Sequence, residues 1–328
     1  MFRLFMPFPK PVNIALLIHE RASLSIVFLL QDLFGRANLL GEASIFKLVF
    51  ISYKKRLVRI HNLELSAVSV EKSTDILLIP PFQADFDFNL ADLTQEIHLI
   101  REFSKRPKLI ASACMGALLA AAAGVLNGQI ATTHWRAKTF VSEHFPAVKW
   151  NLNEMICDTG LRLTSGGYLA AIDLALYLIQ RFHSKRLAHH LGQMILANSI
   201  KQKQSIYAQS LVSPRQIGST FYNLEHWIEH NLSRRFSVCD LAQQSGMSLR
   251  SFQRHFTSEF GISPVKYLQL KRIDRAKTLL KVHRLSLGEI LEDIGLSDPV
   301  SFSRIFLREL GMTPAEFRKA TKAGISSS

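Results

Sequence analysis

Short apolar runs and amphipathic segments alternate along the first two hundred residues of the chain. The apolar runs are aliphatic or β-branched and are bounded by polar residues or proline, so they predict strands. They cover residues 13–19, 43–53, 75–80 and 108–111. The other segments carry apolar residues at helical spacing and predict helices. They cover residues 24–38, 90–104, 116–123, 139–144, 169–182 and 185–199. This alternation predicts an α/β sandwich with a largely parallel sheet and helices on both faces.

The pattern changes near residue 200. Residues 201–217 lose the strand pattern and carry glutamine, serine and a proline, so we place an interdomain linker there. From residue 218 onward the pattern is all helical. We therefore expect an α/β domain over residues 12–200 and an all-α domain over residues 218–321, which agrees with a length of 328 residues.

Residues 251–267 and 301–317 are two copies of one segment. Aligned without a gap, the copies are identical at 7 of 17 positions, whereas chance gives roughly one identity in twenty positions. The similarity continues upstream at an offset of 49 residues, where Ser237, Asp240, Leu241, Gly246 and Ser248 correspond to Ser286, Glu289, Ile290, Gly295 and Ser297. Each copy therefore predicts two helices joined by a tight turn at a glycine.

The helix ends and faces of both copies agree with this interpretation. The Ser-x-x-Asp spacing at residues 237–240 and the Ser-x-x-Glu spacing at residues 286–289 resemble capping boxes. Ser248 and Ser297 are expected to cap the second helices, and residues 264–282 predict a helix that connects the copies. Apolar side chains at a spacing of four form the stripe that we expect to be buried. They are Phe252, Phe256, Phe260, Phe302, Phe306 and Leu310.

The second helix of each copy keeps a face that is not needed for the core. Its members are Ser248, Arg250, Ser251, Gln253 and Arg254 in the first copy, and Ser297, Val300, Ser301, Ser303, Arg304 and Arg308 in the second. Side chains of this kind donate to phosphates and base edges, and a helix fits the major groove of DNA. A merely solvated face is the alternative for one segment. Two copies in a part of the chain with 19 basic and 11 acidic residues favour double-stranded DNA as the partner.

Composition narrows the classes of protein further. The 40 basic and 26 acidic residues give a net charge of +14, which favours an anionic partner. Three cysteines without a pattern argue against a disulfide scaffold and a zinc site, and favour a reducing cytoplasm. Residues 109–126 form an uncharged run that could span a membrane, but its serine, cysteine and glycines favour a buried strand, turn and helix. We predict no metal, no cofactor and no membrane contact.

Six stretches of the C-terminal segment carry a family resemblance. They are residues 241–242, 246–248, 252–256, 261–264, 298–306 and 311–314. With them, residues 218–321 resemble the AraC/XylS family of bacterial transcription regulators. The resemblance implies two helix-turn-helix motifs on promoter DNA and activation of transcription beside RNA polymerase. Residues 294–296 read Ile-Gly-Leu where the family usually has Val or Cys, Gly, and Phe or Tyr, a departure that affects packing more than base contact.

Cys114 lies at a predicted turn between an apolar strand and an alanine-rich helix. A thiol there is close to the unpaired amides of a helix start, which favour the thiolate and can bind an oxyanion. His134, twenty residues further on, is a candidate base. The residues alone leave two interpretations open, a Cys–His hydrolase or a small buried cysteine with a core histidine.

A second resemblance is carried by residues 75–80, 112–116, 124–128, 131–135 and 164–173. They make residues 12–200 similar to the PfpI and class I glutamine-amidotransferase-like superfamily, in particular to the sensor domains of GlxA-like regulators. The resemblance implies a flavodoxin-like sandwich with Cys114 at the nucleophile elbow and His134 beside it. Enzymes of the superfamily place an acid after the first strand, whereas residues 21–31 contain no Asp or Glu. Because losing one member of a catalytic set costs orders of magnitude in rate, we predict no catalytic residues and no enzyme.

We expect a small-molecule effector to bind where open α/β sheets bind ligands, at the carboxyl ends of the strands. The pocket candidates are Cys114, Met115, His134, Gly166, Gly167 and Tyr168. In GlxA-like relatives the effectors tend to be small nitrogenous or quaternary-amine metabolites, and the ring of Trp135 or Tyr168 could contact such a cation. The expected protein is a cytoplasmic, homodimeric transcription activator. The alternatives are a Cys114-dependent hydrolase or dicarbonyl-detoxifying enzyme with a DNA-binding tail, and a redox sensor with a depressed Cys114 pKa.

Overall fold

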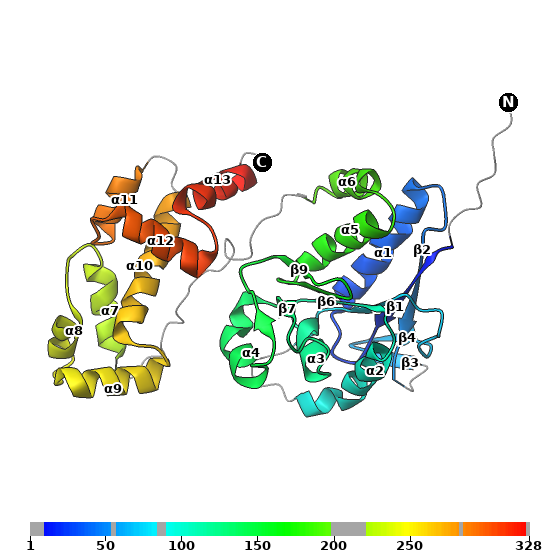
Figure 1. Cartoon of the computed structure of the whole chain (residues 1–328), viewed down its shortest axis with the longest axis horizontal. Coiled ribbons are helices and arrows are strands. Elements are labelled where there is room, and N and C mark those ends of the chain that lie inside the picture. Colours follow the sequence, from blue (N-terminus) through cyan, green and yellow to red (C-terminus); the bar gives the residue numbers. More distant parts are fainter. Residues whose placement is uncertain (1–9, 54–56, 84–89, 198–220, 282–284, 326–328) are drawn as a thin grey trace. The chain divides into compact units, whose positions relative to one another are not determined.

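The computed structural model of the chain describes residues 10–53, 57–83, 90–197, 221–281 and 285–325. Contacts within the chain separate two compact units, Met1–Gln204 and Ser205–Ser328, which we call the N-terminal and C-terminal units (Figure 1). The linker predicted at residues 201–217 lies outside the described residues.

The N-terminal unit is built on a six-stranded sheet with the strand order β2-β1-β5-β6-β10-β9. Its strands are β1 (Val12–Leu17), β2 (Phe46–Ile51), β5 (Ile76–Ile79), β6 (Leu109–Ala113), β9 (Ile156–Asp158) and β10 (Arg162–Ser165). β1 pairs in parallel with β2 and β5, and β6 pairs in parallel with β5 and β10. Among these strands β9 is antiparallel to its neighbour β10. The prediction of a largely parallel sheet is confirmed.

Helices cover both faces of this sheet (Figure 1). On one face lie α1 (Leu24–Leu40), α5 (Ala170–Phe182) and α6 (Lys185–Met194), and on the other lie α2 (Thr94–Ser104), α3 (Gly116–Ala122) and α4 (Lys138–His144). Because side chains alternate across a strand, Ile14 and Leu16 of β1 join the first core while Ala15 and Leu17 join the second. The predicted α/β sandwich is therefore confirmed.

The hydrophobic pattern of the sequence does not predict several short strands that the structure contains. They are β3 (Leu57–Ile60), β4 (Leu63–Ser66), β7 (Ile130–Ala131), β8 (Lys149–Trp150), β9 and β10. β10 contains the polar residues Thr164 and Ser165, which are buried because β10 pairs with β6 on one side and β9 on the other. The strand predicted at residues 43–53 is also shorter than expected, and β2 begins only at Phe46.

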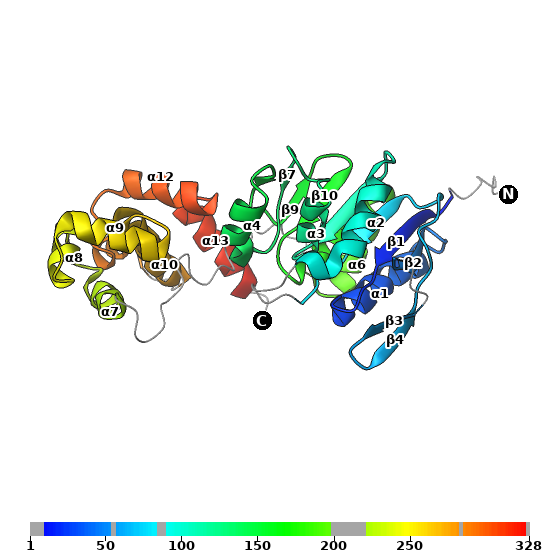
Figure 2. The ribbon, with the colours of Figure 1, turned by 90° about the horizontal axis from the view of Figure 1, so that it is seen from below.

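The described residues of the C-terminal unit form helices α7 to α13. They are α7 (Tyr222–Asn231), α8 (Val238–Gln244), α9 (Leu249–Phe260), α10 (Pro264–Lys281), α11 (Leu287–Asp293), α12 (Pro299–Leu310) and α13 (Pro314–Ile325). α10 runs between the two copies and belongs to the core of each (Figures 1 and 2). Its Tyr267 packs in a core with Phe252, and its Ile273 packs in a second core with Phe302. The two predicted helix-turn-helix copies and their connecting helix are confirmed.

Capping boxes begin the first helix of each copy, as predicted. Ser237 Oγ accepts from the backbone N of Asp240 at 3.3 Å, and Asp240 Oδ2 accepts from the backbone N of Ser237 at 2.6 Å. Residues 286–289 form the same box before α11. The turn of the second copy requires glycine, because Gly295 has φ +67° and a Cβ there would lie 2.6 Å from the carbonyl oxygen of Leu232.

The start of α12 differs from the prediction. Ser248 caps α9, but Ser297 does not cap α12. Asp298 caps it instead, and its Oδ1 accepts from the backbone N of Val300 at 2.9 Å. The second turn is one residue longer than the first, so the cap moves from Ser297 to Asp298. Pro299 then occupies the first turn of the helix, where its missing N–H costs no hydrogen bond.

Candidate functional sites

The predicted DNA-binding face of α9 is accessible. Arg250, Gln253 and Arg254 are exposed, whereas Ser251 is half-buried. Arg250 forms no hydrogen bond or ion pair with another described residue, and Arg254 Nη2 contacts only the neighbouring His255 Nε2, at 3.5 Å. Both guanidinium groups are therefore available to an external anion.

On the corresponding face of α12, some side chains are available to an external ligand and others are held by the protein. Val300, Ser301 and Arg304 are exposed, Ser303 is half-buried, and Arg304 forms no ion pair or hydrogen bond within the described part of the chain. Arg308 is held by the protein itself. Its Nε donates to Glu309 Oε1 at 2.9 Å and its Nη2 donates to Gln269 Oε1 at 3.0 Å.

Ser297, at the turn before α12, is also held by the protein. Its Oγ accepts from Arg235 Nη2 at 2.8 Å. Ser297 and Arg308 therefore already have protein partners, whereas Arg250, Arg254 and Arg304 retain free donors.

In the N-terminal unit, Cys114 follows β6 directly at the carboxyl edge of the sheet. It has φ +51°, and its backbone N donates to the carbonyl oxygen of Ser165 at 2.9 Å. Its own carbonyl oxygen accepts from Thr133 Oγ1 at 2.7 Å. The turn is tight, because a Cβ at Gly116 would lie 2.6 Å from the carbonyl oxygen of Pro80. Cys114 thus has the backbone of a nucleophile elbow.

The chemistry expected of this thiol is not supported. Cys114 is 4% exposed, and burial raises its pKa to about 12 in spite of a hydrogen bond from the backbone of Met115. The prediction that helix-start amides favour the thiolate is wrong, because desolvation of the charged form outweighs that hydrogen bond. The redox-sensor alternative required a depressed pKa and solvent access, and Cys114 has neither.

His134 is not placed as a general base for this cysteine. Its Nδ1 accepts from the backbone N of Arg136 at 3.2 Å, and its ring stacks on Trp135 with centroids 5.4 Å apart. Burial, with a smaller contribution from the charge of Arg136, lowers its pKa. Within the described residues no hydrogen bond joins His134 to Cys114. The imidazole is a neutral cap of a short helical turn.

Tyr168, which follows β10, contacts the segment after β1 in which no acid is present. Its hydroxyl forms hydrogen bonds with Ser25 Oγ at 2.6 Å and with Ser23 Oγ. Ser23 precedes α1, so the segment after β1 that lacks Asp and Glu contributes hydroxyl groups to this edge of the sheet. Tyr168 also remains 41% exposed, so its ring is accessible to a ligand.

The other pocket candidates lie close to Cys114 because β6 and β10 are neighbours in the sheet. Met115 starts the turn into α3 and is 9% exposed. Gly166 follows β10, and its backbone N donates to the carbonyl oxygen of Met155 at 2.8 Å. The carbonyl oxygen of Gly167 accepts from the backbone N of Ala170 at 3.0 Å, which opens α5. These three residues therefore shape the backbone around Cys114.

His19, after the carboxyl end of β1, was missed by the sequence reasoning, which treated it as part of the strand. It is 3% exposed, and neither ring nitrogen has a hydrogen-bond partner among the residues that the structure describes. The ring lies edge-on to Phe82, with centroids 5.7 Å apart, and burial lowers its pKa to about 4. Ser165 Oγ, at the end of β10, is also buried without a partner. Unsatisfied buried polar atoms are rare in native proteins, so these are candidates to contact a ligand.

Asp173 adds a charge to the same edge of the sheet. It lies in the first turn of α5, and burial raises its pKa to about 6. It forms no ion pair with a described residue. The only sequence signal for Asp173 was its place in the stretch that carries the family resemblance.

Two further observations bear on the function classes. Among the described residues, no three His, Cys, Asp or Glu side chains are grouped as metal ligands would be. None of the described helices is long and apolar enough to cross a membrane, and the uncharged run at residues 109–126 forms β6, the turn at Cys114 and α3.

Comparisons with known proteins agree with both halves of this description. Residues 59–181 match the DJ-1/PfpI family, and residues 241–320 match a helix-turn-helix domain family. The HTH-type transcriptional regulator GbdR of Pseudomonas aeruginosa is 24% identical over 316 residues, which cover 92% of this chain and 85% of GbdR. The HTH-type transcriptional regulator GlxA of Rhizobium meliloti is 26% identical over 70% of this chain and 71% of GlxA.

A solved structure from Vibrio parahaemolyticus has a TM-score of 0.50 and 17% identity to this chain, and the match covers 57% of this chain and all of the solved one. At this identity the likeness shows the fold alone. The two family matches and the two relatives, which are regulators, agree with the duplicated helix-turn-helix and the sandwich with its cysteine elbow. The chain thus combines a DJ-1/PfpI-family domain with a helix-turn-helix domain and is similar over most of its length to HTH-type transcriptional regulators.

Proposed function

We propose that the protein binds promoter DNA through α9 and α12 and activates transcription when a small effector occupies the N-terminal unit. One observation carries this proposal. The two helix-turn-helix copies each present an exposed second helix on which Arg250, Arg254 and Arg304 form no ion pair with any described residue. Free guanidinium donors on a helix that fits the major groove are the groups that contact phosphates and guanine edges.

The remaining contacts follow from the same two faces. In this proposal α9 also contributes Ser248, Ser251 and Gln253, and α12 contributes Val300, Ser301 and Ser303. Ser297 and Arg308 act by positioning, since Arg235 and Gln269 already hold them. The DNA-binding domain then spans residues 218–321, the effector domain spans residues 12–200, and residues 201–217 connect them.

The proposed assembly is a cytoplasmic homodimer. It activates transcription beside RNA polymerase, as the resemblance to the AraC/XylS family implies. Two copies of the chain would offer four reading helices, arranged with the symmetry of paired half-sites.

The proposed effector is a small cation bound among Cys114, Met115, His134, Gly166, Gly167 and Tyr168. Asp173 supports a cation, because its half-buried carboxylate has no cationic partner among the described residues. A cation would offset the desolvation that raises the pKa of Asp173. The accessible ring of Tyr168 can contact the same cation through its face. His19 and Ser165 would contribute the polar atoms that now lack partners.

Binding rather than catalysis is favoured at this site. The thiol of Cys114 is protonated at neutral pH, because burial raises its pKa to about 12. His134 Nδ1 is already engaged, and residues 21–31 supply no acid. A Cys114-dependent hydrolase would need an ionised thiol or a histidine that is free to act as its base.

Selection of bound fragments from a library of genomic DNA by the full chain tests the proposal. We expect enrichment of a defined sequence at about 150 mM salt, where non-specific phosphate contacts are weakened. Arg254→Ala or Arg304→Ala should weaken binding to the enriched site by about 1–3 kcal/mol and relax its sequence preference. Arg59→Ala is the control, because it removes the same charge from an exposed site in the N-terminal unit. Equal enrichment of all fragments, with and without trimethylammonium metabolites, would refute DNA recognition.

A further inference from the structure

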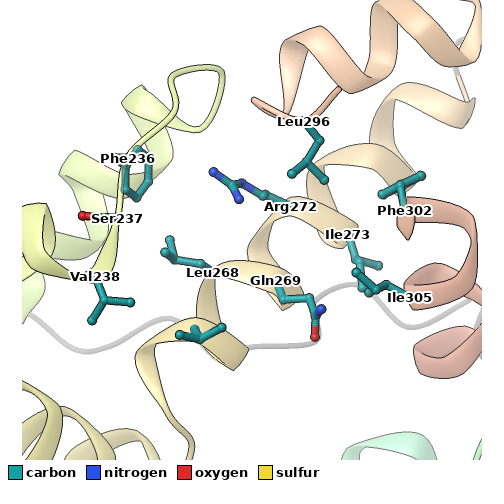
Figure 3. Close-up of a pocket in the computed structure, with 11 residues that line it drawn as sticks. Phe236, Ser237, Val238, Leu268, Gln269, Arg272, Ile273, Leu296, Phe302 and Ile305 are labelled. Carbon is teal, nitrogen blue, oxygen red and sulfur yellow. The ribbon is translucent and has the colours of Figure 1, made fainter. Parts of the chain in front are cut away.

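An apolar cavity of about 260 Å³, partly open to solvent, lies between the two helix-turn-helix copies of the C-terminal unit (Figure 3). Phe236 and Val238 line it from the first copy, and Leu296 and Ile305 line it from the second. α10 forms the remaining wall, with Leu268 and Arg272 among its lining residues. The cavity therefore touches both copies and the helix that connects them.

Arg272 is the charged residue of this cavity, and its guanidinium group has no counter-ion among the described residues. Figure 3 shows its side chain directed into the space between Phe236 and Leu296. Arg272 Nε is buried and has no hydrogen-bond partner in the part of the chain that the structure describes, and the guanidinium lies 5.7 Å from the centre of the Phe236 ring. Burial lowers the pKa of Arg272. A partly desolvated guanidinium with free donors is costly unless an anion binds it.

The neighbouring arginine on α10 shows the usual arrangement. Arg275 donates from Nε and Nη2 to the two carboxylate oxygens of Asp293, at 2.8 and 3.2 Å. No carboxylate within the described residues does the same for Arg272. The bidentate partner that a guanidinium prefers is thus supplied by the chain at Arg275 and is missing at Arg272.

We propose that this cavity binds a small organic carboxylate with an apolar body, which pairs its carboxylate with Arg272. A single fixed cation suits one carboxylate, and the fork of the guanidinium matches its two oxygens. The apolar body would pack against Leu268, Leu296 and Ile305. A volume of about 260 Å³ equals roughly eight or nine waters, enough for one ring or a short alkyl chain. Inorganic phosphate would leave the apolar walls unfilled.

This ligand would act on the spacing of the reading helices. Val238 belongs to α8 of the first copy and Ile305 belongs to α12 of the second. A ligand that contacts both favours one relative arrangement of the copies over others, and it can shift that equilibrium by its difference in affinity for them. The site is separate from the effector pocket of the N-terminal unit and does not depend on how that pocket functions.

Binding of defined carboxylates to the full chain tests this inference without DNA. Hexanoate, benzoate and cyclohexanecarboxylate are the probes, and hexanol, hexylamine and inorganic phosphate are the controls. Titration calorimetry should show one saturable site per chain for at least one probe and no binding of any control. The same probe should raise the midpoint of thermal unfolding in proportion to the logarithm of its concentration once the site is saturated.

Two substitutions locate the site. Arg272→Met keeps an unbranched apolar side chain but removes the charge, and should weaken binding of the probe at least tenfold. Arg275→Gln is the matched control, because Arg275 is exposed and already paired with Asp293, and should leave binding unchanged. Ile305→Phe fills part of the cavity and should also weaken binding, which keeps the inference testable if Arg272→Met does not fold. Failure of all three probes to bind, or equal binding to the parent chain and Arg272→Met, would overturn the proposal.

Discussion

At the scale of single residues, a buried polar side chain at the carboxyl edge of the sheet lowers the stability of the fold. His19 is buried with two unsatisfied ring nitrogens, and leaving a buried polar group without a partner costs about 1–3 kcal/mol. Burial also lowers its pKa to about 4. The unfolded chain therefore binds a proton near pH 6.5 that the folded chain does not bind until about pH 4, so stability is lost as the pH falls through this range.

We predict that His19→Leu stabilises the protein without effector and that the gain grows on acidification. Relative to the parent, the variant should gain about 1–2 kcal/mol at pH 7.5 and a further amount of about 2 kcal/mol at pH 5. Chemical denaturation at the two pH values measures both differences. The same variant should bind the effector more weakly, because it lacks the ring nitrogens. A gain that does not change with pH would contradict the buried neutral state of His19.

Asp173 gives a prediction of the opposite sign. Burial raises its pKa to about 6, so the folded chain binds a proton that the unfolded chain has already lost, and stability falls as the pH rises from about 4 to 6. Asp173→Asn should therefore stabilise the free protein by about 1–2 kcal/mol at pH 7.5 and leave it unchanged near pH 4. Thermal unfolding at both pH values is the measurement. Glu64→Gln, an exposed acid on β4, is the control and should show no such dependence.

At the scale of elements, the longer second turn makes α12 depend on Asp298. Its Oδ1 accepts from the backbone N of Val300 and, at 3.3 Å, from that of Ser301. Loss of an N-cap side chain costs about 1 kcal/mol. We predict that Asp298→Ala destabilises the C-terminal unit by this amount, as seen in urea denaturation followed by circular dichroism. Ser297→Ala is the matched control and should cost less, since Ser297 caps nothing. The reverse ranking would restore Ser297 as the cap.

The elements that could be predicted from sequence are those in which local signals agree. Phe252 and Phe256, one helical turn apart, follow a capping serine, and the same phenylalanine spacing recurs fifty residues later after a capping aspartate. β10 gave no such signal. Its Thr164 and Ser165 are polar and are buried only because β6, about fifty residues earlier, lies beside them. When a strand far away in the sequence causes the burial, no alternation of apolar and polar residues marks the buried strand.

Site residues could likewise be predicted only where the local sequence determines their surroundings. The exposed arginines of α9 and α12 could be predicted because each lies opposite a phenylalanine stripe on its own helix. Arg272 and Arg275 are indistinguishable in sequence, and only the folded unit shows that Asp293 pairs with one of them. The pKa of Cys114 was predicted in the wrong direction, because an elbow next to a helix start indicates amides but not the depth of burial.

At the scale of the whole molecule, one chain would bind two ligands of opposite charge. The C-terminal unit presents free guanidinium groups to a polyanion, and the N-terminal unit presents an unpaired carboxylate, Asp173, to a cation. If effector binding strengthens DNA binding by some factor, DNA must strengthen effector binding by the same factor. That reciprocity holds whatever contacts transmit the coupling.

Tyr168→Phe separates effector binding from DNA binding. The substitution removes the hydroxyl that bonds with Ser23 and Ser25 but keeps the ring, so the loop that follows β10 loses these hydrogen bonds to the start of α1. We expect DNA affinity without effector to remain within a factor of two of the parent, because α9 and α12 are untouched. Effector affinity should fall about tenfold, the equivalent of one lost hydrogen bond of roughly 1.4 kcal/mol. Fluorescence anisotropy of labelled operator, titrated with and without saturating effector, gives both quantities. A variant that lost DNA affinity in the absence of effector would place Tyr168 in the coupling itself rather than in the pocket.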